Sequence, residues 1–354
     1  PIGQGAFYSE RHDKFNIVYD CGNWKNTKLA DKVVINSFHK NDEIDILFIS
    51  HFDYDHVSKI DTLKNKFKIK KVVMPLLHGN EKIFLVNFYN NLGLTKISLL
   101  VNNPSEFFDS ETSVIAVGIA ENNENKDGDG VLQIDDITSL PREVKSGTAL
   151  KINDWVFVPF NFQYTSRSLE LEVYFKEWGL DIQRFKKDID YPENRQLIKK
   201  IYEKVTGRIN QNSMLVYSGP ENDDRRFVCS HYRCHGCYPD CEICCCECHP
   251  RSRNRAGCIY TGDADLNVSR SRIDVIYKKY WKNVGTIQIP HHGDIKSFNK
   301  NVLTGKGYFC PISVGTSNSY GHPHNQLMAE VILNDSCPIL VTEKLDSGFF
   351  QRIV

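Results

Sequence analysis

The chain has 354 residues, of which 41% are hydrophobic and 25% are charged, and its 44 basic side chains balance its 44 acidic ones. A formal net charge of zero excludes attraction of nucleic acid by the molecule as a whole, although a local basic face is compatible with it. No apolar run approaches the roughly 20 residues that cross a bilayer, and no signal peptide is visible. We therefore expect a globular protein with no membrane segment in this chain.

The periodicity of apolar residues along the chain predicts strands that alternate with helices. Predicted strands cover two segments within 1–21, then 44–49, 70–75, 97–101, 113–119, two segments within 150–160, 212–217, 257–261, 286–290, 308–314 and 338–342. Predicted helices cover 26–40, 57–67, 81–92, 168–206, 265–281 and 325–333. This alternation is typical of a layered α/β protein.

The most informative stretch is His51-Phe52-Asp53-Tyr54-Asp55-His56, which follows the predicted strand 44–49. Two imidazoles and two carboxylates at one strand end would repel one another, or be desolvated at high cost, unless a cation or solvent satisfied them. The stretch therefore indicates a metal site rather than a polar surface loop. Asp20, at an earlier strand end, has two interpretations that stay open: a carboxylate that orients a ligand, or a turn residue before Gly22.

Further potential ligands follow other predicted strands: Asp263 in a Thr-Gly-Asp sequence, the pair His291-His292, and His322 with His324. Because all of them stand at strand ends, we expect one site assembled from several loops on one edge of the sheets. Nitrogen and carboxylate ligands from separate loops suit one or two divalent cations in an open site. Asp263 is the natural candidate for a carboxylate that bridges two cations.

The ordered motifs resemble a known family. His-x-Asp-x-Asp-His, Thr-Gly-Asp, Pro-His-His-Gly and Tyr-Gly-His-Pro occur in that order and resemble the metallo-β-lactamase superfamily. More narrowly, with Gly3-Gln4-Gly5 near the start, the chain is similar to the branch that contains the nuclease-like domain of ComEC competence proteins and the choline-phosphate esterases. The resemblance covers about Gly3 to Pro323. It implies a single domain over 1–354, an αββα sandwich with a two-metal hydrolytic site at one edge.

The resemblance also assigns roles to residues. It places His51, Asp53 and one histidine of the His291-His292 pair on the first metal, Asp55, His56 and His322 on the second, and Asp263 as the bridge. The metal set is thus His51, Asp53, Asp55, His56, Asp263, His291 and His322, with Asp55, Asp263 and His292 in catalysis. The remaining histidine of the pair, or His324, is a candidate proton donor to the leaving group. For His324 the alternative, which we favour, is a residue that supports a ligand or faces solvent.

Two departures from the family pattern affect the expected chemistry. Asp53 stands where many members have His, so the site is richer in oxygen and tolerates Mn²⁺ as an alternative to Zn²⁺. Asp294 stands where the branch has Ser after Pro-His-His-Gly, which leaves the transfer of substrate open. The resemblance implies hydrolysis by a hydroxide that two metals activate. We expect a phosphodiesterase or nuclease acting on nucleic acid; the alternatives are hydrolysis of another bond, such as a thioester or lactam, and an effector subunit that a partner activates.

Twelve cysteines are present, and eight of them fall within twenty residues: Cys229, Cys234, Cys237, Cys241, Cys244, Cys245, Cys246 and Cys248. The spacings Cys234-x-x-Cys237 and Cys241-x-x-Cys244 are those of structural Zn²⁺ sites, and thiolate–metal bonds would supply folding energy to a segment with almost no apolar residues. We expect a Cys-rich zinc-binding insertion over 222–257. A loop of free or oxidised cysteines and an iron–sulfur cluster are the alternatives. The clustering indicates a reducing, cytoplasmic location rather than a secreted disulfide scaffold.

Basic residues border the Cys-rich insertion. Arg251, Arg253 and Arg255 follow its last cysteines and are candidates for gripping a phosphate backbone. The acidic residues of the same segment keep its net charge small, so nucleic-acid contact here is a hypothesis. A helical insertion over 166–208 is longer than the fold needs. It keeps open a protein partner that binds through the two insertions.

Overall fold

The computed structural model of the chain describes residues 1–25, 27–77, 79–120, 130–134, 142–162, 176–177, 213–222, 226–231, 253–303 and 307–353. Within these residues the strands form two large sheets and two small ones. None of the described helices is both long and apolar enough to cross a membrane.

The first sheet is parallel except at one edge. Its strands are, in order, β1 (Phe7–Arg11), β2 (Asn16–Cys21), β4 (Ile46–Phe48), β6 (Lys71–Pro75), β7 (Ser113–Val117) and β10 (Glu143–Val144), with β1 antiparallel to β2. β3 (Glu43–Ile44) and β5 (Lys68–Ile69) form a separate parallel pair. Strands β4 and β6 are buried on both faces, as their continuous apolar sequences predict for a parallel sheet covered on both sides.

The second sheet is mixed. Its order is β19 (Cys337–Val341), β18 (Phe309–Ser313), β17 (Val284–Ile287), β16 (Gly257–Tyr260), β13 (Leu215–Pro220), β12 (Trp155–Phe162), β11 (Ala149–Ile152) and β9 (Val131–Gln133), with β8 (Ile119–Ala120) paired to β12. The strands from β16 to β19 are parallel to one another, whereas β13 is antiparallel to both β12 and β16. A third, three-stranded sheet has the order β15 (Arg253–Arg255), β14 (Phe227–His231) and β20 (Phe350–Ile353).

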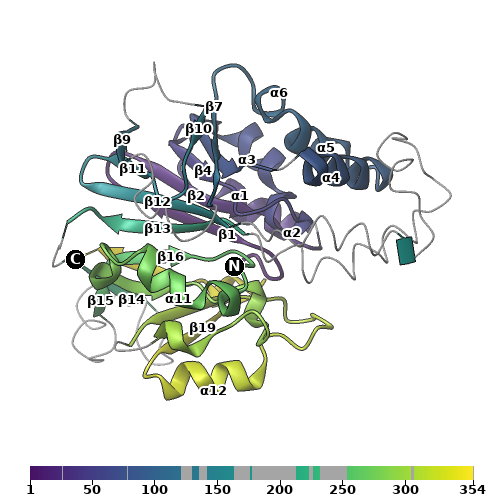
Figure 1. Cartoon of the computed structure of the whole chain (residues 1–354). Coiled ribbons are helices and arrows are strands. Elements are labelled where there is room, and N and C mark those ends of the chain that lie inside the picture. The colour runs from purple at the N-terminus through teal and green to yellow at the C-terminus, as the bar shows by residue number, and fades with distance from the viewer. Residues whose placement is uncertain are drawn as a thin grey trace.

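Helices cover the outer faces of the two large sheets (Figure 1). On the first sheet lie α1 (Lys28–Ile35), α2 (Tyr54–Val57), α3 (Ile60–Lys66), α4 (Gly79–Asn91), α5 (Thr95–Asn102) and α6 (Pro104–Phe108). On the second sheet lie α11 (Leu266–Ile276) and α12 (Asn325–Leu333). Short 3₁₀ turns occur at Trp281–Asn283, His291–Gly293, Lys300–Leu303 and Leu345–Ser347.

Alternating side chains of the strands build the layers. In β2, Ile17 and Tyr19 point into the core between the two sheets, whereas Val18 packs against the helices of the first sheet. Phe48 of the first sheet meets Phe157 of the second with ring centroids 5.4 Å apart. The prediction of a layered α/β protein is confirmed, and the described residues stack as helices, sheet, sheet and helices.

Most of the predicted elements agree with the structure, but one has the wrong type, and 338–342 is not the last strand because β20 follows it. The predicted helix at 325–333 is confirmed with the same bounds as α12. The predicted strand at 97–101 is wrong, because this segment lies in helix α5. Ile97, Leu100 and Val101 are buried together there, and their spacing of three and four residues places them on one helical face. A short apolar run carries too few residues to separate the helical period from a buried strand.

Much of the two predicted insertions lies outside the described residues. This applies to 166–208 apart from residues 176–177, and to the cysteines from Cys234 to Cys248 together with Arg251. The backbones of Cys229 and Arg253 are described, in β14 and β15 respectively. The zinc site predicted from the cysteine spacing therefore stays a prediction.

We call residues 232–252, between β14 and β15, the Cys-rich segment. The two strands that flank it are described and lie at one end of the second sheet. β14 leads into the segment and β15 leads out of it, and the two strands pair antiparallel. β15 continues directly into β16. Asp263 follows the far end of β16, three residues after Tyr260. The segment is therefore attached at the opposite end of β16 from Asp263, beside the C-terminal strand β20 (Figure 1).

The core between the sheets predicts a large cost for removing a central ring. Phe157 is fully buried and contacts the rings of Phe15 and Phe48, so Phe157→Ala is expected to lower the free energy of unfolding by about 3–5 kcal/mol. Urea denaturation followed by circular dichroism measures the change. Leu345→Ala, at a side chain that is 67% exposed, is the control and should shift stability by less than about 0.5 kcal/mol. Equal effects of the two variants would contradict this core.

Candidate metal centre

Histidine and carboxylate side chains gather where parallel strands of both sheets end. The loop from His51 to His56 follows β4 in the first sheet. In the second sheet, Asp263 follows β16, His291 and His292 follow β17, and His322 lies in the loop after β18. Because the carboxyl ends of these strands lie at the same edge of the sandwich, loops distant in sequence meet at one place.

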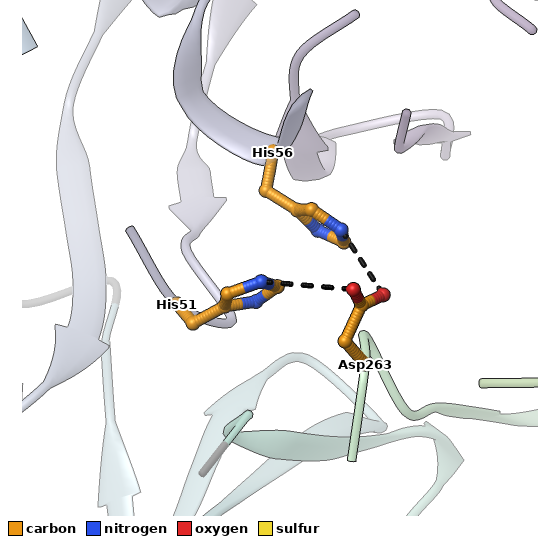
Figure 2. A group of neighbouring side chains, drawn as sticks. All are labelled: His51, His56 and Asp263. Atoms are coloured by element: carbon orange, nitrogen blue, oxygen red, sulfur yellow. Dashed lines mark ion pairs between the residues drawn. The ribbon is translucent and has the colours of Figure 1, made fainter. Parts of the chain in front are cut away.

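One group of potential ligands consists of His51, His56 and Asp263 (Figure 2). The Nε2 atom of His56 lies 3.1 Å from Oδ1 of Asp263, and the Nε2 atom of His51 lies 3.9 Å from Oδ2 of the same carboxylate. The two imidazole rings are 4.0 Å apart between centroids. All three side chains are buried, and their ligand atoms all face one small volume.

A second group shares one residue with the first. Asp55, His56 and His292 also lie close enough to hold one ion. The Nε2 atom of His292 lies 3.0 Å from Oδ2 of Asp55, and both side chains are buried. Because His56 belongs to both groups, the two form one continuous site.

The other predicted ligands lie around these groups. Asp53 Oδ2 is 3.8 Å from His51 Nε2, and His291 Nε2 is 3.8 Å from Asp263 Oδ2. The His322 ring lies beside the His291 ring, with centroids 6.0 Å apart. The structure thus brings all the predicted ligands together. It differs from the predicted grouping in placing His292, rather than His322, against Asp55.

Hydrogen bonds fix which nitrogen of two histidines faces the centre. The Ser50 hydroxyl lies 2.6 Å from Asp20 Oδ2 and donates its only proton to that carboxylate. His51 Nδ1, 2.8 Å from the same hydroxyl, must therefore be the donor to Ser50. His56 Nδ1 in turn donates to Asp20 Oδ2 at 2.8 Å. With the Nδ1 protons used in this way, each Nε2 can present a lone pair to a cation.

Two further contacts tie ligands from different loops together. The Ser213 hydroxyl lies 3.0 Å from His51 Nδ1 and accepts a hydrogen bond from the Asp263 backbone N–H at 2.9 Å. His292 Nδ1 donates to the Ser313 carbonyl oxygen at 2.8 Å, which directs its Nε2 toward Asp55. Each contact holds a ring or carboxylate in the orientation that the centre requires.

The buried nitrogens fit a metal ion. Within the described part of the chain, the Nε2 atoms of His51 and His56 make no well-directed hydrogen bond, although both are buried and face the Asp263 carboxylate. A buried polar atom without a partner is costly, and a bound cation satisfies two such nitrogens and a carboxylate at once. Imidazole and carboxylate together suit Zn²⁺ and also Mn²⁺.

Burial lowers the pKa values of the histidines in the centre, whereas neighbouring carboxylates raise them. Burial, with the neighbouring His56, lowers the pKa of His51 well below its usual value, so this ring is neutral, as a metal ligand must be. Burial also opposes charge on His56, but the carboxylates of Asp263 and Asp20 outweigh it and raise the pKa of His56 well above its usual value. Burial lowers the pKa of His322 to about 4. The carboxylates around His56 therefore favour positive charge at this ring, and a cation bound at its Nε2 would take the place of the proton.

Glycine is required where the chain start meets the ligand loop. Gly5 adopts φ of 143°, and a Cβ there would lie 2.7 Å from the Asp55 carbonyl oxygen. A Cβ on Gly22 would overlap the same carbonyl. This close approach lets the Ala6 backbone N–H donate to the Asp55 carbonyl at 3.1 Å. The Gly-Gln-Gly sequence near the start thus braces the loop that carries the ligands.

Several supporting residues were not predicted from the sequence. Ser50 directly precedes the loop from His51 to His56, so its position in the sequence could have marked it as a supporting residue. Asp294 lies 3.7 Å from His291 Nδ1 through its Oδ2 atom and is placed to orient that ring. Ser213 carries no recognisable motif. Of the two interpretations of Asp20, its hydrogen bond with His56 supports the carboxylate that orients a ligand.

His324 is placed differently from the centre. Its Nδ1 atom accepts a hydrogen bond from the Gln326 backbone N–H at 3.3 Å, which caps the start of α12, and its side chain is exposed. This placement supports a structural role at the helix end rather than proton donation to a leaving group.

Comparison with known proteins bears on the first part of the chain. Residues 6–136 match the family model of the metallo-beta-lactamase superfamily. This match supports the superfamily. It includes the loop from His51 to His56 and ends before Asp263, so the second sheet lies largely outside it. Curated proteins provide no match to the chain. The superfamily and the His/Asp groups together indicate a hydrolase that depends on a divalent metal.

The Asp20 network predicts a loss of metal affinity without loss of any ligand. An amide at Asp20 cannot accept hydrogen bonds at both oxygen positions, so Asp20→Asn is expected to weaken binding of Zn²⁺ by about 10- to 100-fold. Competition with a chromophoric chelator measures the affinity. Glu111→Gln, at an exposed ion pair with Lys68, should bind Zn²⁺ like the unmodified protein. Wild-type affinity in Asp20→Asn would exclude an orienting role for this carboxylate.

Proposed function

We propose that the protein is a metal-dependent phosphodiesterase that cleaves nucleic acid. The observation that carries the proposal is the pair of adjoining ligand groups that share His56. Divalent cations in such a paired site activate a nucleophile near neutral pH and stabilise both the attacking and the leaving oxygen of a phosphodiester. A single carboxylate–imidazole site would support this displacement less well.

Different residues of the centre would hold each of the two ions. His51 and His56 would contribute their Nε2 atoms, and Asp263, which faces both rings, would contribute its carboxylate. Asp55 and His292 would hold the adjoining ion, and the single lone pair of His56 Nε2 would serve one of the two ions. Asp53, His291 and His322 border the same volume and complete the proposed set. We propose Zn²⁺ as the native metal, with Mn²⁺ as the alternative that the carboxylates allow.

A partner role for the Cys-rich segment is the second part of the proposal. Its base, β14 with β15, is attached at the end of β16 opposite Asp263. That placement favours contact with a protein partner over contact with the bond being cleaved. Arg251, Arg253 and Arg255 then become candidates for this contact, alongside their proposed role on a phosphate backbone. An effector subunit that its partner activates is the corresponding alternative to a free-standing nuclease.

A reducing location completes the proposal. Cys21, Cys258 and Cys310 carry thiols that form no disulfide. Reduced cysteines, and a zinc site built from thiolates, are typical of the cytoplasm rather than of secreted proteins. We therefore propose that the protein acts in the cytoplasm.

Phosphodiester cleavage is tested first on bis-p-nitrophenyl phosphate, and then on single- and double-stranded DNA and RNA, with Zn²⁺ or Mn²⁺ added. We expect activity that a chelator abolishes and that Asp263→Asn reduces to the chelated level. Asp265→Asn is the matched control, because this carboxylate caps α11 two residues away and lies outside both ligand groups. Metal-loaded protein that cleaves none of these substrates would shift the assignment to a thioester or lactam, or to an effector that needs a partner.

The structural zinc is tested by metal content. Two metals at the centre and one in the Cys-rich segment predict about three equivalents per chain. Replacing Cys234 and Cys237 together by Ser should remove about one equivalent while cleavage of bis-p-nitrophenyl phosphate persists. Replacing Cys21 by Ser, at a buried thiol in β2, should leave the metal content unchanged. Loss of cleavage together with the zinc would contradict the separation of the segment from the centre.

A further inference from the structure

Two exposed aromatic side chains stand beside the metal centre. Trp24 is 47% exposed and Tyr320 is 63% exposed, whereas the ligand side chains are buried or partly buried. Trp24 follows β2, and Tyr320 lies in the loop after β18. Each ring leaves apolar surface open to solvent, and burying that surface against a ligand would be favourable.

Trp24 adjoins the ligand loop through Tyr54. The two rings lie 6.3 Å apart between centroids at an angle of 90°. Tyr54 stands between the ligands Asp53 and Asp55 in the chain, so Trp24 contacts the loop that carries these ligands. The Trp24 backbone N–H donates to the Gln4 carbonyl at 2.8 Å, which holds this residue at the rim.

Tyr320 borders the side that the second sheet supplies. Its ring stacks on the ring of His322 with centroids 6.0 Å apart and an angle of 16° between planes. His322 in turn lies beside His291. Because one face of Tyr320 covers the histidine, its opposite face is the one presented to solvent.

The two loops that carry these rings contact each other. The Lys25 ammonium donates to the Ser317 hydroxyl, and the Gly315 backbone N–H donates to the Gln4 side chain at 3.2 Å. Gln4 thus contacts both the Trp24 backbone and the loop of Tyr320. Trp24 and Lys25 therefore lie on a segment that contacts the loop of Tyr320, and we call these three residues the aromatic rim.

We propose that the aromatic rim stacks the bases of single-stranded nucleic acid, so that a phosphodiester between them reaches the metal centre. This inference rests on the proposed function and names its substrate class. Aromatic rings stack on every base, whereas the bases of a duplex are already stacked and paired. Lys25 supplies one cation for a neighbouring phosphate.

Charge at the rim supports stacking as the main source of affinity. Glu343, which follows β19, contacts the loop of Tyr320, because its carboxylate accepts a hydrogen bond from the Thr316 backbone N–H at 3.0 Å. The whole chain has no net charge. A strand bound mainly through its phosphates would need several basic side chains and would be released by salt. Affinity at this rim should therefore depend only weakly on salt concentration and strongly on whether the strand carries bases.

Binding and cleavage can be tested separately. The metal-loaded protein is titrated with fluorescent phosphorothioate oligonucleotides, one with bases and one abasic strand of the same length, and affinity is read from fluorescence anisotropy. We expect the base-bearing single strand to bind about 10-fold or more tightly than the abasic strand and the duplex. Trp24→Ala and Tyr320→Ala should each remove most of that preference, whereas Trp24→Phe and Tyr320→Phe should retain it. Phe350→Ala, at a ring that is 58% exposed on β20, is the matched control and should bind like the unmodified protein.

Two outcomes would overturn the inference. One is equal binding of base-bearing and abasic strands by the unmodified protein. The other is an equal loss for both strands in the Ala variants, which would mean that the rings only support the ligand loops. Neither outcome bears on phosphodiester hydrolysis, which bis-p-nitrophenyl phosphate decides independently. If the protein prefers base-bearing strands but cleaves no phosphodiester, base stacking at the aromatic rim is supported and the proposed phosphodiesterase activity is contradicted.

Discussion

The constraint on which this structure depends is the concentration of carboxylates and imidazoles in a space that excludes water. Asp20, Asp55 and Asp263 are each less than one-tenth exposed, and two histidine nitrogens face Asp263 without a directed hydrogen bond to any described residue. Such a cluster is expensive unless cations balance it. The serine and aspartate contacts behind the rings hold them in the orientation that a bound cation requires.

The centre also needs both halves of the sandwich. One half supplies the loop from His51 to His56, and the other supplies Asp263 and His292, so the packing between Phe48 and Phe157 sets the distance between ligands. The match to the superfamily model covers most of the first half and, of the second, only β8 and β9. Ser213 shows how closely the halves cooperate, because one hydroxyl contacts a ring from the first and the backbone of a carboxylate from the second.

Local chemistry made part of this site predictable. The loop from His51 to His56 and the Thr-Gly-Asp sequence each place ligands directly after an apolar strand, and that pattern needs no long-range information. The contact of Ser213 with His51 spans 162 residues and leaves no local trace. The choice between His291 and His292 depends on backbone φ angles of 49° and 54°, which residues other than glycine seldom adopt. Helix α5 was mistaken for a strand because its apolar run is too short to show a period.

The attachment of the Cys-rich segment has a consequence for how this protein can vary. The segment enters through β14 and leaves through β15, and these strands pair with each other and with the C-terminal strand. The pairing of β14 with β15 fixes both ends of the Cys-rich segment, whatever residues lie between the two strands. Since the entropy of closing a loop grows only slowly with its length, residues can be added, removed or exchanged there at small thermodynamic cost. The fold can thus acquire a new binding specificity at one end of β16 while the ligands at the other end stay in register.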